Sequence, residues 1–136
     1  MSLHENVINV GEKIAAAARA AGRDPAAVTL VAVSKKVPAE RVREAMRAGL
    51  ALFGENYAQE LRDKAREVVG ARWHFVGPLQ RNKVKYVVGV AELIHSVDSP
   101  ALLDEIAARA QKLGVVQRCL LQVNIGEEPQ KSGCAP

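Results

Sequence analysis

The chain has 136 residues, 49% of them hydrophobic and only 4% aromatic, and its formal net charge is +4. This length allows one domain with its own core, and the composition is that of an ordinary globular protein. Basic and acidic residues alternate, and no Lys/Arg run is interleaved with aromatic residues, which argues against nucleic-acid binding. The small positive charge instead suits an anionic small ligand.

We expect a cytoplasmic protein that does not contact the membrane. No basic and apolar signal sequence opens the chain, and no apolar stretch approaches about 18 residues. The two cysteines, Cys119 and Cys134, do not form a Cys-x-x-Cys pair, a pattern typical of a reducing compartment. His74, His95 and Cys119 lack the spacing of zinc ligands, so no metal site is predicted.

The hydrophobic pattern predicts alternating helices and strands. Apolar residues at helical spacing indicate helices over residues 3–21, 38–48, 57–69, 83–88 and 99–113. Short apolar runs indicate strands over residues 29–34, 50–54, 73–76, 93–96 and 118–124. The strands recur about every 20 to 25 residues, which is the length of a parallel βα unit. Five such units fit either an open doubly wound sheet or most of a (β/α)8 barrel, which needs about 250 residues when complete.

The first strand, Thr29–Ser34, is an unbroken apolar run, and we expect it to be buried on both faces. It ends in Lys35 and Lys36, at the carboxyl edge where parallel sheets carry their chemistry. A lysine in apolar surroundings is a nucleophilic amine that attacks carbonyl groups to form imines. Strand alternation puts Lys35 on the face of Val31 and Val33, which favours Lys35 over Lys36. The alternative is that both lysines belong to a solvated loop.

Other strand ends also carry polar side chains, each with an ordinary structural alternative. Asn56 would contact a ligand or cap the following helix. His74 would contact a ligand or be a core histidine satisfied by a neighbour. In the helix over residues 57–69, Glu60 and Lys64 are expected to form an exposed pair that contributes little energy.

Several segments resemble, in order and spacing, the pyridoxal phosphate homeostasis protein family. They are Val31-Ala32-Val33-Ser34-Lys35, Phe53-Gly54-Glu55-Asn56-Tyr57, Trp73-His74-Phe75-Val76-Gly77-Pro78-Leu79-Gln80, Gln122-Val123-Asn124-Ile125 and Lys131-Ser132-Gly133. The resemblance extends over essentially the whole chain.

This resemblance implies an α/β fold of the (β/α)8 TIM-barrel type, like the N-terminal domain of bacterial alanine racemase. Residues 1–136 would form a single domain with an N-terminal helix and about the first five βα units. Pyridoxal phosphate (PLP) would be held as an internal aldimine on Lys35. Asn56, His74 and Asn124 would lie near the cofactor, and Lys131 would be a second lysine that contacts or exchanges it.

The family is thought to bind and buffer PLP without substrate turnover, so PLP-dependent apo-enzymes are the expected recipients of the cofactor. Its members are typically monomeric. Family members continue beyond the Lys131-Ser132-Gly133 segment, so the chain is expected to lack the last barrel strands. Two alternatives remain at this point. One is a PLP-dependent amino-acid racemase, and the other is a truncated structural fragment that binds no cofactor.

Overall fold

A computed structural model describes all 136 residues. The helices are α1 (Leu3–Ala20), α2 (Ala39–Arg47), α3 (Ala58–Glu67), α4 (Val84–Val87) and α5 (Pro100–Leu113), with short 3-10 turns η1 (Pro25–Ala27) and η2 (Arg81–Lys83). The strands are β1 (Ala32–Val33), β2 (Leu52–Glu55), β3 (Arg72–Phe75), β4 (Leu93–Val97) and β5 (Arg118–Leu121). None of these helices combines the length and the apolar character needed to cross a membrane.

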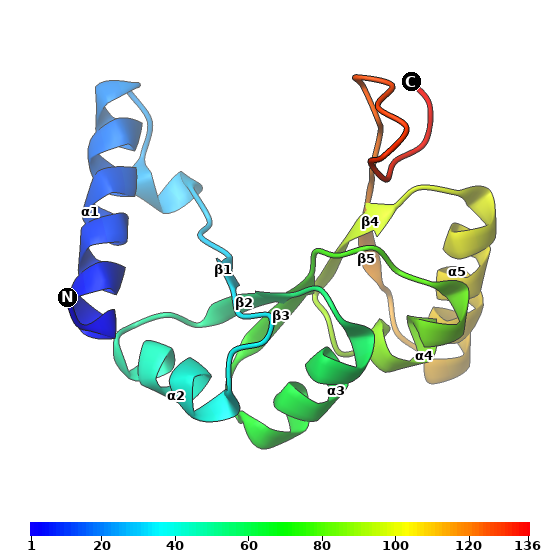
Figure 1. Cartoon of the computed structure of the whole chain (residues 1–136), viewed down its shortest axis with the longest axis horizontal. Coiled ribbons are helices and arrows are strands. Elements are labelled where there is room, and N and C mark those ends of the chain that lie inside the picture. The colour runs from blue at the N-terminus through cyan, green and yellow to red at the C-terminus, as the bar shows by residue number, and fades with distance from the viewer.

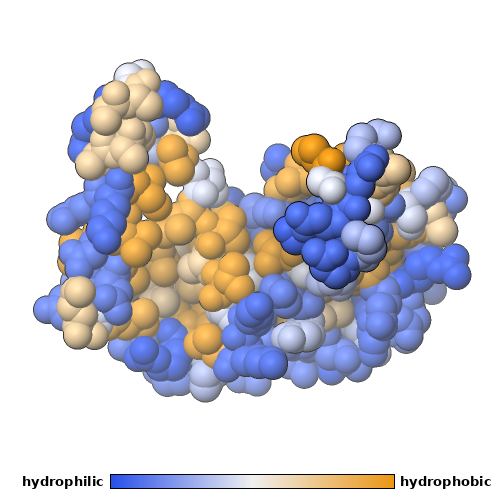
Figure 2. Space-filling model, turned by 45° about the horizontal axis from the view of Figure 1, so that its top comes forward, coloured by the Kyte–Doolittle hydropathy of each residue, from blue (hydrophilic) through white to orange (hydrophobic).

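The five strands form one parallel sheet in the order β1-β2-β3-β4-β5, so each strand pairs with the next strand in the chain. This confirms the predicted series of parallel βα units. Helices α2 to α5 follow one another along one side of the sheet, whereas α1 stands beyond the β1 end (Figure 1). The other side of the sheet is open between α1 and the C-terminal segment, and hydrophobic side chains line this hollow (Figure 2).

The hydrophobic core lies between the sheet and its helices. Phe53, Phe75 and Ile94 project from the strands and are at most 2% exposed. Leu61 of α3 and Ile106 of α5 complete the same cluster from the helical side. Alternation along each strand therefore sends one set of side chains into this core and the other set to the concave face of the sheet.

The expectation that the first strand is buried on both faces is wrong. Only Ala32 and Val33 pair with β2, and Val33 remains 54% exposed. The last strand is likewise shorter than predicted, because it ends at Leu121, which is 67% exposed. Both strands lie at the edges of the sheet, and nothing covers their concave side. The apolar runs of these two strands therefore include residues on the exposed concave face of the sheet in addition to residues that face the core.

The helix predicted over residues 99–113 is confirmed as α5, Pro100–Leu113. Ser99 caps the helix by accepting a hydrogen bond from the Leu102 amide at 3.1 Å, and Pro100 occupies the first helical position. Cys119 of β5 packs against the core, and burial raises the pKa of its thiol.

Candidate functional site

The chain turns sharply after β1, at the carboxyl edge of the sheet. The Val37 amide donates a hydrogen bond to the Ser34 carbonyl at 3.0 Å and closes the turn. Lys35 and Lys36 are its two central residues, and Lys36 has a φ of +58°. A positive φ at the third position of a tight turn normally requires Gly or Asn, so surrounding contacts must hold Lys36 in this conformation.

Those contacts come from α3 and fix both peptide groups that flank Lys35. On one side, the Lys64 amine donates a hydrogen bond to the Ser34 carbonyl at 2.5 Å. On the other side, the Lys36 amide donates to both carboxylate oxygens of Glu60, at 2.9 and 3.1 Å. The backbone on either side of Lys35 is therefore anchored to the same helix.

A buried ionic network lies beneath the turn. Glu55 is fully buried at the end of β2, and its Oε1 accepts hydrogen bonds from the Lys64 amine and the Ser34 hydroxyl, each at 2.7 Å. The Lys64 side chain is only 8% exposed. Burial raises the pKa of Glu55, and the hydrogen bonds from Lys64 and Ser34 oppose this rise. The second Glu55 oxygen, Oε2, has no partner.

The expected exposed Glu60–Lys64 pair is thus wrong, since Lys64 is buried and essential to the turn. Its Nζ is 3.6 Å from Glu60 but only 2.7 Å from Glu55. The sequence did contain a signal. Lys64 follows Leu61 by three residues and precedes Val68, the residue after α3, by four, and both Leu61 and Val68 are buried.

The two lysines of the turn point to different surroundings. The Lys36 amine lies 5.8 Å from the centre of the Tyr57 ring, at the start of α3. The Lys35 side chain is exposed and forms no ion pair. Val31 and Val33, which share its face by alternation, lie on the concave side. A Cβ placed at Gly54 there would be 3.1 Å from Val31 and 3.5 Å from Val33. These contacts place Val31 and Val33 beside Gly54, and the exposed Lys35 follows them in the turn.

His74 pairs with His95 across neighbouring strands. His95 Nε2 lies 2.9 Å from His74 Nδ1, and the ring centres are 5.0 Å apart. Burial lowers the pKa of both rings, and the nearby His95 lowers that of His74 further. At this distance one of the two facing nitrogens must be unprotonated and accept a hydrogen bond from the other ring. His74 therefore has a neighbouring partner, which agrees with the alternative of a core histidine. His95 was not among the predicted site residues.

Asn56 does not cap the following helix. The residue at the cap position of α3 is Tyr57, and no side-chain cap bond is formed. Asn56 is instead pressed against Gly77, where an added Cβ would lie 2.6 Å from the Asn56 carbonyl oxygen. The end of β2 is thereby held against the end of β3, with the half-buried Asn56 side chain at the carboxyl edge.

Asn124 organises the loop that carries Lys131. Its side-chain amide donates to the Glu128 carbonyl at 2.7 Å, and its oxygen accepts from the Glu128 amide at 3.1 Å. Lys131 is 66% exposed and forms an ion pair with Glu128 at 2.7 Å. This loop encloses a hollow of about 370 Å³ beyond β5. The structure therefore gives Asn124 a role in shaping the loop, and Lys131 lies exposed on that loop.

Strand order brings Lys35, Asn56 and His74 to neighbouring positions, because each follows or ends one of three consecutive strands. Asn124 and Lys131 follow the last strand at the same carboxyl edge. An exposed amine on a fixed backbone, a free amide and an apolar floor form a donor set that fits an aldehyde bearing an aromatic ring. No cluster of three metal-ligating side chains is present.

Comparisons with known proteins identify the family. A model of the alanine racemase N-terminal domain matches residues 9–136. A pyridoxal phosphate homeostasis protein of Pseudomonas aeruginosa is 46% identical over 99% of this chain and 60% of its own length. The protein of the same name from Aquifex aeolicus is 44% identical over 100% of this chain and 60% of its own. The chain thus spans about 60% of the length of these curated relatives.

Solved structures agree with this assignment. A protein from Bifidobacterium adolescentis described as unknown has a TM-score of 0.88 and 34% identity, over 97% of this chain and 58% of its own. PipY of Synechococcus elongatus with PLP bound has a TM-score of 0.79 and 34% identity, over the same shares of the two chains. The predicted TIM-barrel type of fold and the resemblance seen in the motifs are both confirmed. The chain belongs to the family of the alanine racemase N-terminal domain.

Proposed function

We propose that this protein binds pyridoxal phosphate covalently at Lys35 and holds it in reserve without turning over a substrate. One observation supports this most directly. Both peptide groups that flank Lys35 are anchored to α3, while the Lys35 amine is left exposed and without an ionic partner. The names of the relatives and the PLP bound to PipY support the choice of cofactor.

Pyridoxal phosphate supplies an aldehyde that a neutral lysine amine attacks, forming a C=N bond with loss of water. Lys35 would provide that amine, and Glu60 and Lys64 would keep its backbone in place. Asn56 would donate a hydrogen bond from the end of β2. His74, its proton shared with His95, would present a neutral ring at the end of β3.

We assign the remaining residues by the same reasoning. Asn124 would position the loop after β5, and Lys131 would extend from that loop towards the cofactor or accept it during exchange. The ion pair of Lys131 with Glu128 would then be broken when the cofactor is present.

We further propose that the protein is cytoplasmic and monomeric and that PLP-dependent apo-enzymes receive the cofactor. Racemisation would need a second acid or base on the other side of the cofactor, and no specific observation favours that activity. Size-exclusion chromatography with light scattering tests the monomer. Incubation with L-alanine, followed by chiral analysis for D-alanine, tests the absence of turnover.

Reductive trapping tests the central proposal. The chain is incubated with PLP, reduced with borohydride, digested and mapped by mass spectrometry. We expect the pyridoxyl group on Lys35, its loss in Lys35→Ala and its retention in Lys36→Ala, which removes the neighbouring amine of the same turn. An equal distribution of the label over surface lysines would refute a specific site. The absence of any label would instead favour a fragment that binds no cofactor.

A further inference from the structure

A cluster of basic side chains lies on the helical side of the sheet, away from Lys35. Helices α3, α4 and α5 border a hollow of about 580 Å³ there. Four basic residues and no acidic residue line it, and they are Arg62, Arg66, Lys85 and Arg109. We call these four residues the cation cluster. Ala65, Tyr86 and Val90 provide the apolar part of the lining.

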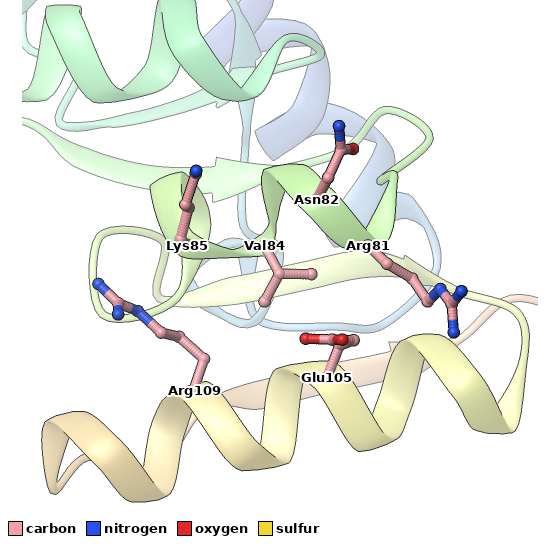
Figure 3. A pocket seen from close by; sticks show the side chains of 6 residues that line it. All are labelled: Arg81, Asn82, Val84, Lys85, Glu105 and Arg109. Atoms are coloured by element: carbon pink, nitrogen blue, oxygen red, sulfur yellow. The ribbon is translucent and has the colours of Figure 1, made fainter.

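A second hollow, of about 670 Å³, adjoins the first and shares Lys85 and Arg109 with it. It adds one more basic residue, Arg81, and a single acidic one, Glu105. Figure 3 shows Lys85 and Arg109 extending from α4 and α5 at one end of this hollow, with Arg81 at the other end. The positive charge is therefore concentrated at the end that continues into the first hollow.

The cluster lacks the acidic partners found elsewhere on the surface. On α2, Arg41, Arg43 and Arg47 all pair with glutamates of the same helix. In the cation cluster only Arg62 has an ion pair, with Asp63 at 2.8 Å.

Arg66, Lys85 and Arg109 form no ion pair at all. The Nε of Arg109 is in addition buried without a hydrogen-bond partner. A buried donor of this kind normally has a partner, so Arg109 lacks both an ion pair and a hydrogen bond at this atom.

Three cationic side chains lie around the ring of Tyr86, which lines the first hollow. Its ring centre lies 4.7 Å from the Arg62 guanidinium, 5.2 Å from the Lys85 amine and 5.9 Å from the Lys83 amine. Like charges held this close raise the local positive potential, and an anion relieves their repulsion. Guanidinium groups also match the geometry of phosphate and carboxylate oxygens.

We propose that the cation cluster is a binding site for a small oxyanion that carries two or more phosphate groups. The size of the hollow lies in the range of small-molecule sites, about 300–1,000 Å³. Its basic side chains converge from three helices on one hollow, whereas a stripe along the surface would suit an extended polymer. The proposal is independent of covalent binding at Lys35.

Calorimetric titration with tripolyphosphate, with inorganic phosphate for comparison, tests the site. Arg66→Glu/Lys85→Glu reverses two exposed charges of the cluster, and Lys13→Glu/Arg23→Glu makes the same change of charge on exposed residues near the N-terminus. We expect one tripolyphosphate per chain, weakened by at least about tenfold in the cluster variant and by less than about twofold in the control. Inorganic phosphate, with fewer charged oxygens, should bind more weakly. Circular dichroism checks that both variants are folded.

Any of four results would overturn the proposal, three of them from the titrations and the fourth from a Lys35 variant. The first is no binding of tripolyphosphate by the unmodified chain, and the second is equal weakening in the two charge-reversal variants. The third is tighter binding of a hexaglutamate peptide than of tripolyphosphate, because the surface would then suit an acidic protein segment. Lys35→Ala should retain full affinity for tripolyphosphate. A loss of affinity there would place the anion at the cofactor site and would refute a separate one.

Discussion

Replacement of Lys64 by methionine tests how the Lys35 turn is held. Methionine keeps much of the side-chain length of lysine but removes the charge that faces the fully buried Glu55. Breaking a buried ion pair by removing one partner costs about 3–5 kcal/mol, since the other charge stays buried without compensation. For a chain of this size, this corresponds to a fall in Tm of roughly 10–20 °C.

Urea denaturation at pH 7 and pH 5 provides the measurement. Glu55 has a raised pKa, and without Lys64 that pKa rises further above its ordinary value of 4.5. Stability linked to a raised pKa is fully present below the ordinary value and is lost as the pH rises through the folded-state pKa. The Lys64→Met variant should therefore lose less stability at pH 5 than at pH 7.

A double variant supplies the control. Lys64→Met/Glu55→Gln removes both charges and should recover most of the lost stability, because no uncompensated charge remains buried. Both variants should attach PLP more slowly than the unmodified chain, since the Ser34 carbonyl has lost the amine that fixes it. The reasoning is refuted if Lys64→Met costs less than about 1 kcal/mol, or if the double variant is as unstable as the single one.

Three further predictions concern neighbouring parts of the site. The low pKa values of His74 and His95 should make the folded state less stable as the pH falls below 6.5, and an NMR titration showing both rings at or above 6.5 would contradict this. Gly77→Ala should cost about 1–3 kcal/mol in urea denaturation, because the new Cβ meets the Asn56 backbone, and an unchanged midpoint would show that the two loops move apart freely. Asn124→Ala should accelerate amide exchange in the loop after β5 with a loss of only about 1 kcal/mol overall, whereas unchanged exchange would remove its role in the loop.

Local periodicity predicts where the helices and strands lie, but it does not predict what packs against each of them. The helix predicted over residues 3–21 is observed as Leu3–Ala20, and the strand predicted over 93–96 as Leu93–Val97. Both depend on side-chain patterns within a few residues. The exposure of Val33 depends instead on what covers the concave face, and no pattern within the strand reports this.

The site shows the same division. Alternation from Val31 and Val33 favours Lys35, and this choice stays a prediction because Lys35 lies in the turn that follows β1. Helical periodicity predicts an exposed Lys64, because charged residues usually face the solvent, whereas this side chain is buried. Its partner Glu55 lies nine residues away on a strand, so only the packing of α3 on β2 brings them together. The pairing of His74 with His95 likewise depends on strand order.

The consecutive order of the strands has a consequence for how the chain folds. Ala32 aligns with Phe53 and Phe53 with Trp73, so each strand finds its neighbour about 20 residues earlier in the chain. No strand pairs with a strand that is distant in the sequence, and contacts of short sequence separation favour rapid folding. At about 5–20 residues per second, a ribosome would deliver one new βα unit roughly every one to four seconds. Each new unit could dock on a sheet edge that has already emerged, so this sheet is suited to growth from its N-terminal end during synthesis.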